Sequence, residues 1–189
     1  LTRLCSDFLN SNSHLYETVK ILLITNKPAF PKVDGGCVAS ANLFELLASF
    51  ASVKYLTIAT QKHPFDDRLF PSKWKVDRDD AVTIDTRVTF TKALPYLCNQ
   101  KSYNVDRFHN RAMDAWIQNS VDAIAPDLIV LDSLYTASYI NSIRSYFSGK
   151  IVLRTHNVEH LIWKTYGDNE NNLLKRFYLK KLYNDLKPF

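Results

Sequence analysis

"KILLITNKPAFPKVDGGCVASANLFELLASFASVKYLTIAT", residues 20–60, alternates apolar and loop-forming stretches in an order that predicts a βαβ unit. Lys20–Thr25 is an almost continuous apolar run, which is typical of a strand covered on both faces. Val53–Thr60 is a second such run, rich in β-branched and aromatic residues. Between the two lie a loop with two prolines and a double glycine and then Cys37–Phe50, whose leucines have helical spacing. This order implies parallel strands joined by a right-handed crossover.

The rest of the chain repeats this alternation. Three further strands are predicted, at Ala81–Phe90, Asp127–Ser133 and Lys150–Thr155. Three further helices are predicted, at Tyr103–Ala125, Tyr135–Phe147 and Asn171–Lys187, while the charged, proline-interrupted residues 61–80 read as loop. We therefore expect a doubly wound, Rossmann-like α/β domain over residues 20–189, preceded by a leader helix and linker at residues 1–19.

The helical stripes also predict which side chains face inward. The first helix should bury Leu43, Leu46, Leu47 and Phe50, and the last should bury Leu174, Tyr178 and Leu182. The helix after residue 103 should bury Val105, Phe108, Ala112, Ala115, Trp116 and Val121.

Composition indicates a soluble globular domain. Hydrophobic residues make up 46% of the 189 residues and charged residues 23%, and no apolar stretch is long enough to cross a bilayer. The first residue is not Met, and we expect a fragment or processed chain. The three cysteines, Cys5, Cys37 and Cys98, are dispersed and odd in number, which favours reduced thiols in a cytoplasmic protein.

The chain is moderately basic, with a net charge of +5. That charge fits an anionic partner such as nucleotide phosphates, nucleic acid or an acidic membrane surface, and it also fits a protein that is merely kept soluble. The basic helix stretch "KRFYLKK" has the same alternatives: a packed helix with a solvated face, or a membrane-surface element. No nucleic-acid-binding module surrounds it, so we expect no nucleic-acid partner.

Ligands of an open parallel sheet bind at the carboxyl ends of its strands, and three loops qualify there: those after Thr25, Leu131 and Thr155. The first loop places Gly35 and Gly36 directly before a helix, where backbone amides and the helix dipole favour an anion such as phosphate. Lys27 could reach the same anion or be solvated. The stretch matches neither GxGxxG nor a P-loop.

The third loop belongs to "RTHNVEH", residues 154–160, in which a buried strand opens into polar groups. His156 can donate to a ligand oxygen or act as a base, and Asn157 can cap a helix or bind a ligand. Glu159 can orient His156 or cap the next helix. His156 and His160 have the i,i+4 spacing of a metal pair but lack a third ligand, so we expect no metal.

Two more polar residues stand at strand ends on the same edge. Asp132 could bind a sugar hydroxyl or cap the following helix, and Arg154 is a candidate for binding or supporting the substrate. A nucleophile elbow and a zinc signature are both missing from the sequence.

Four segments stand out: "ILLITNKPAFPKVDGG", "VASANLFELLASFA", "KSYNVDRF" and "VLRTHNVEHLIWK". Together they resemble the amino-terminal domain of family four retaining glycosyltransferases, which have the GT-B fold. The last two segments resemble a bacterial branch of that family. The resemblance covers the chain from Lys20 to its end. The double glycine alone is a moderately specific signal, and it becomes fairly specific when it is joined to "RTHNVEH" at the right place in the strand order.

The resemblance implies a two-domain enzyme of carbohydrate biosynthesis, a hexosyltransferase whose Rossmann-like domains face each other across a cleft. The amino-terminal domain holds a carbohydrate or lipid-linked acceptor, with peripheral membrane contact as an option, and the other domain holds most of the nucleotide-sugar. By resemblance, Gly35 and Gly36 approach the donor diphosphate and His156 is the catalytic residue near the transferred sugar. Asn157 and Glu159 support that site. No metal or other cofactor is expected, because helix amino-termini and basic side chains neutralise the diphosphate.

The chain stops at Phe189, so the resemblance leaves the donor-binding domain outside it, and we expect the isolated domain to be inactive. Two alternatives stay open. One is half of a sugar-nucleotide epimerase, which shares the two-domain architecture. The other is a stand-alone Rossmann-like binding domain.

Overall fold

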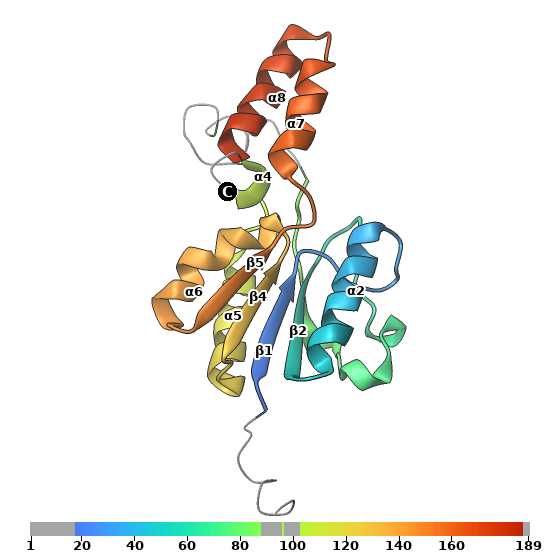
Figure 1. The fold of residues 1–189 in the computed structure, drawn as a ribbon, viewed down its shortest axis with the longest axis vertical. Coiled ribbons are helices and arrows are strands. Elements are labelled where there is room, and N and C mark those ends of the chain that lie inside the picture. Colours follow the sequence, from blue (N-terminus) through green and yellow to red (C-terminus); the bar gives the residue numbers. More distant parts are fainter. Residues whose placement is uncertain (1–17, 88–95, 97–102, 187–189) are drawn as a thin grey trace, which may run out of the picture.

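The structure, a computed structural model, describes residues 18–87, 96 and 103–186 (Figure 1). It is an α/β fold built on a five-stranded parallel sheet with the order β3-β2-β1-β4-β5. The strands are β1 (Lys20–Thr25), β2 (Ser52–Ala59), β3 (Ala81–Thr83), β4 (Leu128–Asp132) and β5 (Lys150–Arg154). The predicted doubly wound, Rossmann-like parallel sheet is confirmed. The leader helix expected within residues 1–17 lies outside the described residues.

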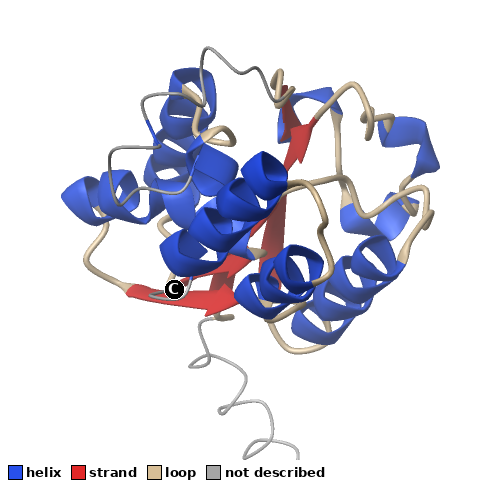
Figure 2. Ribbon diagram, turned by 90° about the horizontal axis from the view of Figure 1, so that it is seen from above, coloured by secondary structure: helices blue, strands red, loops and turns tan. Residues whose placement is uncertain are grey.

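Helices cover both faces of the sheet, as the view from above in Figure 2 shows. The long helices are α2 (Gly35–Ala48), α5 (Arg111–Ile124), α7 (Glu159–Asp168) and α8 (Leu173–Leu186). The shorter helical segments are η1 (Asp67–Leu69), η2 (Ser72–Trp74), η3 (Arg78–Asp80), α4 (Tyr103–Asp106), η5 (Leu134–Tyr139) and α6 (Ile140–Tyr146), where η marks a 3-10 helix. In Figure 1, α7 and α8 form a hairpin beyond the carboxyl ends of the strands instead of covering a face. Among the described helices, none is long and apolar enough to cross a membrane.

The core lies in two layers, one on each face of the sheet. Leu22 and Ile24 of β1 pack in the layer formed with α5 and α6, and Ile21 and Leu23 pack in the layer formed with α2. All four side chains are at most 1% exposed. Because both faces of β1 are covered, its sequence is a continuous apolar run with no alternation, as the sequence predicted.

The edge strand β3 is shorter than predicted. It spans Ala81–Thr83 instead of Ala81–Phe90, of which residues 88–90 lie outside the described part of the chain. The neighbouring strand β2 ends at Ala59. The last hydrogen bond between the two strands therefore runs from Ile84 N to Ala59 O, at 2.9 Å. Past that point Asp85 and Arg87 form a local ion pair.

The helix predicted over Tyr103–Ala125 is broken into α4 and α5. The cause is the buried hydroxyl of Tyr139, which donates to Phe108 O at 2.5 Å and accepts from Asn110 N at 3.1 Å. Asn110 then caps α5 by accepting from Ala112 N at 2.8 Å. The inward stripe of α5 is accordingly Met113, Ile117 and Val121, of which only Val121 was predicted.

The inward stripe of α2 is partly displaced from the prediction. Its buried residues are Cys37, Ser40, Ala41 and Phe44. The predicted Leu43 and Leu47 pack against the core but are only partly buried, and the predicted Leu46 and Phe50 are 62% and 60% exposed. Phe44 stacks on Trp74, with ring centroids 3.7 Å apart, and this contact fixes which side of the helix faces the core. Trp74 comes from the segment that the sequence assigned to loop, so its contribution to the core was not predictable from helical spacing.

The last helix buries Leu179, Leu182 and Leu186, while the predicted inward residue Leu174 is 84% exposed. The helix packs on α7 instead of the sheet, and Leu179 Cβ lies 3.4 Å from the position that a Cβ on Gly167 of α7 would occupy. Leu186 anchors the hairpin to the sheet domain in a small buried cluster with Val105.

Candidate functional site

The candidate site lies where the winding direction of the sheet reverses. The chain leaves β1 toward β2 on one side and leaves β4 toward β5 on the other, so the carboxyl ends of β1 and β4 border a crevice. A cavity of about 610 Å³ occupies that place. It is lined by Asn26, Lys27, Asp34, Gly35, Gly36, Ala39, Ser133, Tyr135, Arg154, Thr155, His156, Asn157 and Glu159. The cavity therefore brings together all the site residues predicted from sequence except Asp132, which lies beneath it.

The loop after β1 is held against the sheet by hydroxyl groups. Thr25 Oγ1 donates to Lys27 O at 2.9 Å and lies 3.0 Å from the hydroxyl of Tyr55, which accepts from Ala29 N at 3.0 Å. Burial raises the pKa of Tyr55 to about 12, so this hydroxyl keeps its proton at neutral pH. The loop that carries Lys27 toward the cavity is thus fixed by buried hydrogen bonds.

The double glycine forms the first turn of α2, instead of preceding the helix as predicted. Asp34 is the N-cap, and its side chain accepts from Cys37 N at 2.9 Å and from Lys27 Nζ at 2.6 Å. The hydrogen bond from Lys27 holds the pKa of Asp34 well below its usual range. In the first turn of a helix the amides of Gly35 and Gly36 have no intrahelical acceptor. Both amides therefore stay available at the cavity wall.

The two glycines differ in their surroundings. A Cβ on Gly36 would lie 2.8 Å from Lys27 Nζ, so a side chain there would displace the ammonium group. A Cβ on Gly35 would have no heavy atom within 4 Å. Packing within the described chain thus explains Gly36, whereas at Gly35 the space in front of the backbone is open to a ligand.

Beneath the cavity, Asp132 is fully buried and lies in register with Thr25 on one side and Arg154 on the other. Its carboxylate accepts from Ser40 Oγ at 2.5 Å and Arg154 Nη1 at 2.8 Å, and it lies 3.1 Å from His156 Nε2. Burial raises the pKa of Asp132, but the hydrogen bonds and positive charges of these neighbours outweigh it and hold the pKa below its ordinary value. Asp132 neither caps the next helix nor reaches the cavity, so its part in the site is supporting.

His156 is oriented by this carboxylate. Its Nε2 faces Asp132, and because a carboxylate can only accept, the proton of a neutral ring belongs on Nε2. The other ring nitrogen, Nδ1, is then left for a ligand, as an acceptor in the neutral ring and as a donor in the cation. The side chain lines the cavity and remains 19% exposed.

Glu159 is the first residue of α7, and it contacts Tyr135 instead of orienting His156. The hydroxyl of Tyr135 donates to Glu159 Oε2 at 3.4 Å, and burial together with the charge of Glu159 raises the pKa of Tyr135 to about 12. His160, also on α7, lies beside Tyr183 with ring centroids 5.9 Å apart, so its ring does not share the environment of His156. Within the described residues there is no group of three or more acidic, His or Cys side chains placed to hold a metal.

Sequence reasoning missed Ser40 and Ser133. Ser40 is the one hydroxyl on the buried stripe of α2, and a polar residue on such a stripe was the available signal for a buried partner. Ser133 follows Asp132 with φ 132°, a strained region for a residue with a side chain. Its amide donates to Arg154 O at 2.8 Å, and its hydroxyl accepts from Tyr135 N at 3.3 Å. The local sequence does not indicate this strain, because a backbone conformation of this kind predicts glycine and the residue here is Ser133.

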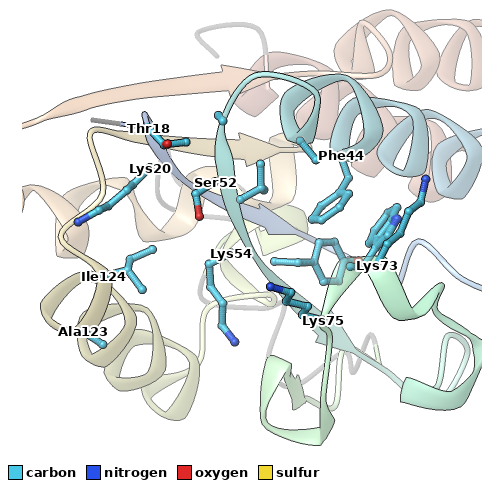
Figure 3. Close-up of a pocket in the computed structure, with 14 residues that line it drawn as sticks. Thr18, Lys20, Phe44, Ser52, Lys54, Lys73, Lys75, Ala123 and Ile124 are labelled. Atoms are coloured by element: carbon cyan, nitrogen blue, oxygen red, sulfur yellow. The ribbon is translucent and has the colours of Figure 1, made fainter. Parts of the chain in front are cut away.

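A larger cavity of about 870 Å³ lies at the opposite edge of the sheet (Figure 3). Lys20, Lys54, Lys73 and Lys75 stand around it, with Phe44 on the α2 side. Lys54 and Lys73 are held by ion pairs with Asp80 and Glu45. This cavity is at the amino ends of β1 and β2, away from the strand ends where ligands of such sheets bind, and its lysines are already partnered in part.

No protein-family model matches this chain, and no curated protein sequence matches it. The cavity at the carboxyl edge and the motifs that line it are therefore the features from which a function can be inferred.

Proposed function

We propose that this chain is the acceptor-side domain of a retaining glycosyltransferase that uses a nucleotide-sugar donor. The observation that carries the proposal is the convergence of the Gly35 and Gly36 amides with His156 in one cavity at the reversal point of the sheet. His156 is 120 residues beyond Gly36 in sequence. Together the groups supply the two things that glycosyl transfer needs here: an anion site and a hydrogen-bonding group beside it.

The first turn of α2 suits the donor diphosphate. Helix amino-termini favour anions through their unsatisfied amides and the helix dipole. Gly35 offers an unobstructed approach, and Lys27 places an ammonium group beside Gly36. As the bond between sugar and diphosphate breaks, negative charge grows on the diphosphate oxygen. Donors and cations already fixed at that place stabilise the developing charge without further reorganisation.

His156 suits the transferred sugar and the oxygen that leaves it. Asp132 holds the ring through Nε2, so that Nδ1 can bond to a sugar hydroxyl or, when the ring is charged, to the departing oxygen. Arg154 shares the same carboxylate and contributes positive charge at the cavity wall. Asn157 and Glu159 complete the wall on the α7 side.

The proposal includes a second domain. The nucleotide and most of the donor would be held by a second Rossmann-like domain facing this cavity, with the acceptor bound on the side described here. We expect the enzyme to act in the cytoplasm on a carbohydrate or lipid-linked acceptor, without a metal or other cofactor. The basic α8, which exposes Leu173, Leu174 and Phe177, supports peripheral contact with a membrane.

The test is a transfer assay on the polypeptide encoded by the complete gene, with a panel of nucleotide-sugars and product analysis. His156→Ala should lower kcat/KM about a hundredfold or more, since both general acid–base and electrostatic contributions are of that order. His160→Ala is the matched control, because His160 is close in sequence but does not line the cavity. Its kcat/KM should stay within a few-fold of the parent value and its melting temperature should be unchanged. His156→Ala also removes one donor from Asp132, so its melting temperature should fall, and both variants are assayed well below the temperature at which they unfold.

Equal turnover in the two histidine variants would remove His156 from the mechanism. A nucleotide-sugar converted to an isomer with no acceptor consumed would favour the epimerase alternative. Donor binding without any turnover would favour a binding domain.

A further inference from the structure

A second cavity, of about 380 Å³, lies beside the first at the carboxyl edge of the sheet. It is lined by residues that follow three strands and α4: Asn26, Lys27, Thr60, Lys62, His63, Thr86, Arg87, Arg107 and Phe108. Asn26 and Lys27 line both cavities, so one loop, the segment after β1, forms their common wall. We call this second cavity the basic cavity.

The described lining of the basic cavity is rich in Lys and Arg side chains. Four of its lining residues are Lys or Arg, namely Lys27, Lys62, Arg87 and Arg107, and among the described residues that line it none is Asp or Glu. Carboxylates outside the lining, Asp34 and Asp85, pair with Lys27 and Arg87. The described lining itself therefore holds cationic side chains and no carboxylate, and two of its cations are paired with carboxylates just outside it.

The local fold fixes the backbone that carries Lys62 and the guanidinium of Arg107. Thr60 and His63 exchange backbone hydrogen bonds of 3.0 and 3.1 Å, which closes a turn and fixes Lys62 and His63 at the end of β2. The guanidinium of Arg107 donates to Thr86 O at 3.3 Å and lies 5.2 Å from the ring centroid of Phe108. Burial lowers the pKa of His63; the charges of Lys27 and Lys62 lower it further, and the charge of Asp34 opposes them. The ring of His63 therefore lies within the electrostatic influence of the two lysines.

We propose that the basic cavity binds a phosphate monoester carried by the acceptor. The proposal rests on the proposed function, in which the donor diphosphate takes the neighbouring cavity and the acceptor must lie next to it. A phosphate monoester carries up to two negative charges and three strong acceptor oxygens, which matches several clustered Lys and Arg side chains better than a single carboxylate does. The volume also suits a phosphate with part of a sugar or alcohol attached.

The binding test uses this 189-residue chain and requires no donor. Glucose 6-phosphate and glucose are titrated separately while the ring signals of the histidines are followed by NMR. Glucose 6-phosphate should raise the pKa of His63, because a bound dianion offsets the charges of Lys27 and Lys62, and glucose should not. Lys62→Glu should weaken the binding of glucose 6-phosphate about tenfold or more, the equivalent of one charge-assisted hydrogen bond. Lys150→Glu is the control, since Lys150 is an exposed lysine at the amino end of β5, and its binding should match the parent.

A second arm identifies the carrier of the phosphate. Phosphatidylcholine vesicles containing phosphatidic acid are compared with vesicles without it. Vesicle binding that needs phosphatidic acid and is lost in Lys62→Glu, but kept in Lys150→Glu, assigns the phosphate to a lipid. Binding of glucose 6-phosphate alone assigns it to a soluble acceptor.

The proposal is overturned if neither glucose 6-phosphate nor phosphatidic acid changes the His63 signal. It is also overturned if Lys62→Glu and Lys150→Glu weaken binding equally. Its failure is separable from that of the proposed function. If the complete protein transfers sugar but no phosphate binding is found, only the assignment of an acceptor phosphate to the basic cavity is overturned. Phosphate binding in a protein that consumes no nucleotide-sugar overturns the glycosyltransferase proposal and leaves the anion site standing.

Discussion

Asp132→Asn should destabilise the fold more than any other single change of a polar side chain at the carboxyl edge. Asp132 is fully buried and is the shared partner of Ser40, Arg154 and His156. The Asn side chain has nearly the same shape, so the variant removes the charge while keeping the packing. It also turns one of the two acceptor oxygens into a donor, which then faces a donor of the chain.

The magnitude follows from opposing terms. Each hydrogen bond to a charged group contributes about 1.5–3 kcal/mol, and three donors lose a charged partner. Two effects offset this loss: the carboxylate no longer has to be desolvated, and the Arg154 side chain is 36% exposed and can regain water. The net cost is about 2–4 kcal/mol, which for a chain of this length lowers the melting temperature by about 5–12 °C.

The pH dependence gives a second signature. The pKa of Asp132 is lower in the folded state than in the unfolded state, where it is about 3.9. The ionised carboxylate therefore adds stability that is present above that unfolded value and is lost as the pH falls through the folded pKa. The parent and the Asn variant should differ at neutral pH and converge in acid.

The measurement is urea unfolding followed by circular dichroism, at neutral pH and at successively lower pH. Asp127→Asn is the matched control, since Asp127 is exposed and stands just before the same strand. Its side chain accepts a hydrogen bond from Lys20 N at 2.8 Å. An Asn can keep that bond, so the control should change stability by no more than about 0.5 kcal/mol. If Asp132→Asn were as stable as the control at neutral pH, the view of Asp132 as the centre of a stabilising network would be wrong.

Two further substitutions test how the fold is held together. Tyr139→Phe should cost about 1–3 kcal/mol in urea unfolding, because the carbonyl of Phe108 loses its buried donor, whereas the exposed Tyr166→Phe should be neutral. Leu182→Ala should cost about 2–3 kcal/mol by opening a cavity between α7 and α8, whereas Leu174→Ala, at a side chain that is 84% exposed, should change stability by less than about 0.5 kcal/mol. Equal effects within either pair would contradict the packing described here.

The sheet was predictable because its signal is local. A strand covered on both faces must be apolar throughout, and β1 was predicted with its observed bounds, Lys20–Thr25, on that basis alone. The carboxyl-edge location of the site followed from the alternation of strands and helices, which fixes where the loops after parallel strands meet. Asp132 could be placed at this edge, but its depth could not be read from its position at a strand end.

The errors arose where a distant residue decides a local outcome. The break before α5 depends on the hydroxyl of Tyr139, and the buried side of α2 depends on Trp74, from a segment without strong periodicity. The partner of His156 was misassigned for the same reason. Glu159 is three residues away in sequence, whereas Asp132 is 24 residues away but on the neighbouring strand, in register with Arg154. Sheet register, and not sequence distance, selects the partner.

The polar residues at this edge have two different physical origins. A buried carboxylate at the end of a central strand needs donors, and Ser40, Arg154 and His156 supply them, so part of the cluster would be required by the fold even without a ligand. That requirement does not extend to Gly35, whose missing side chain relieves no contact within the described chain. It also does not extend to Nδ1 of His156, because Asp132 contacts the other ring nitrogen, Nε2. Those two features therefore point to a ligand, and variants at Gly35, which leave the partners of Asp132 in place, separate binding from stability.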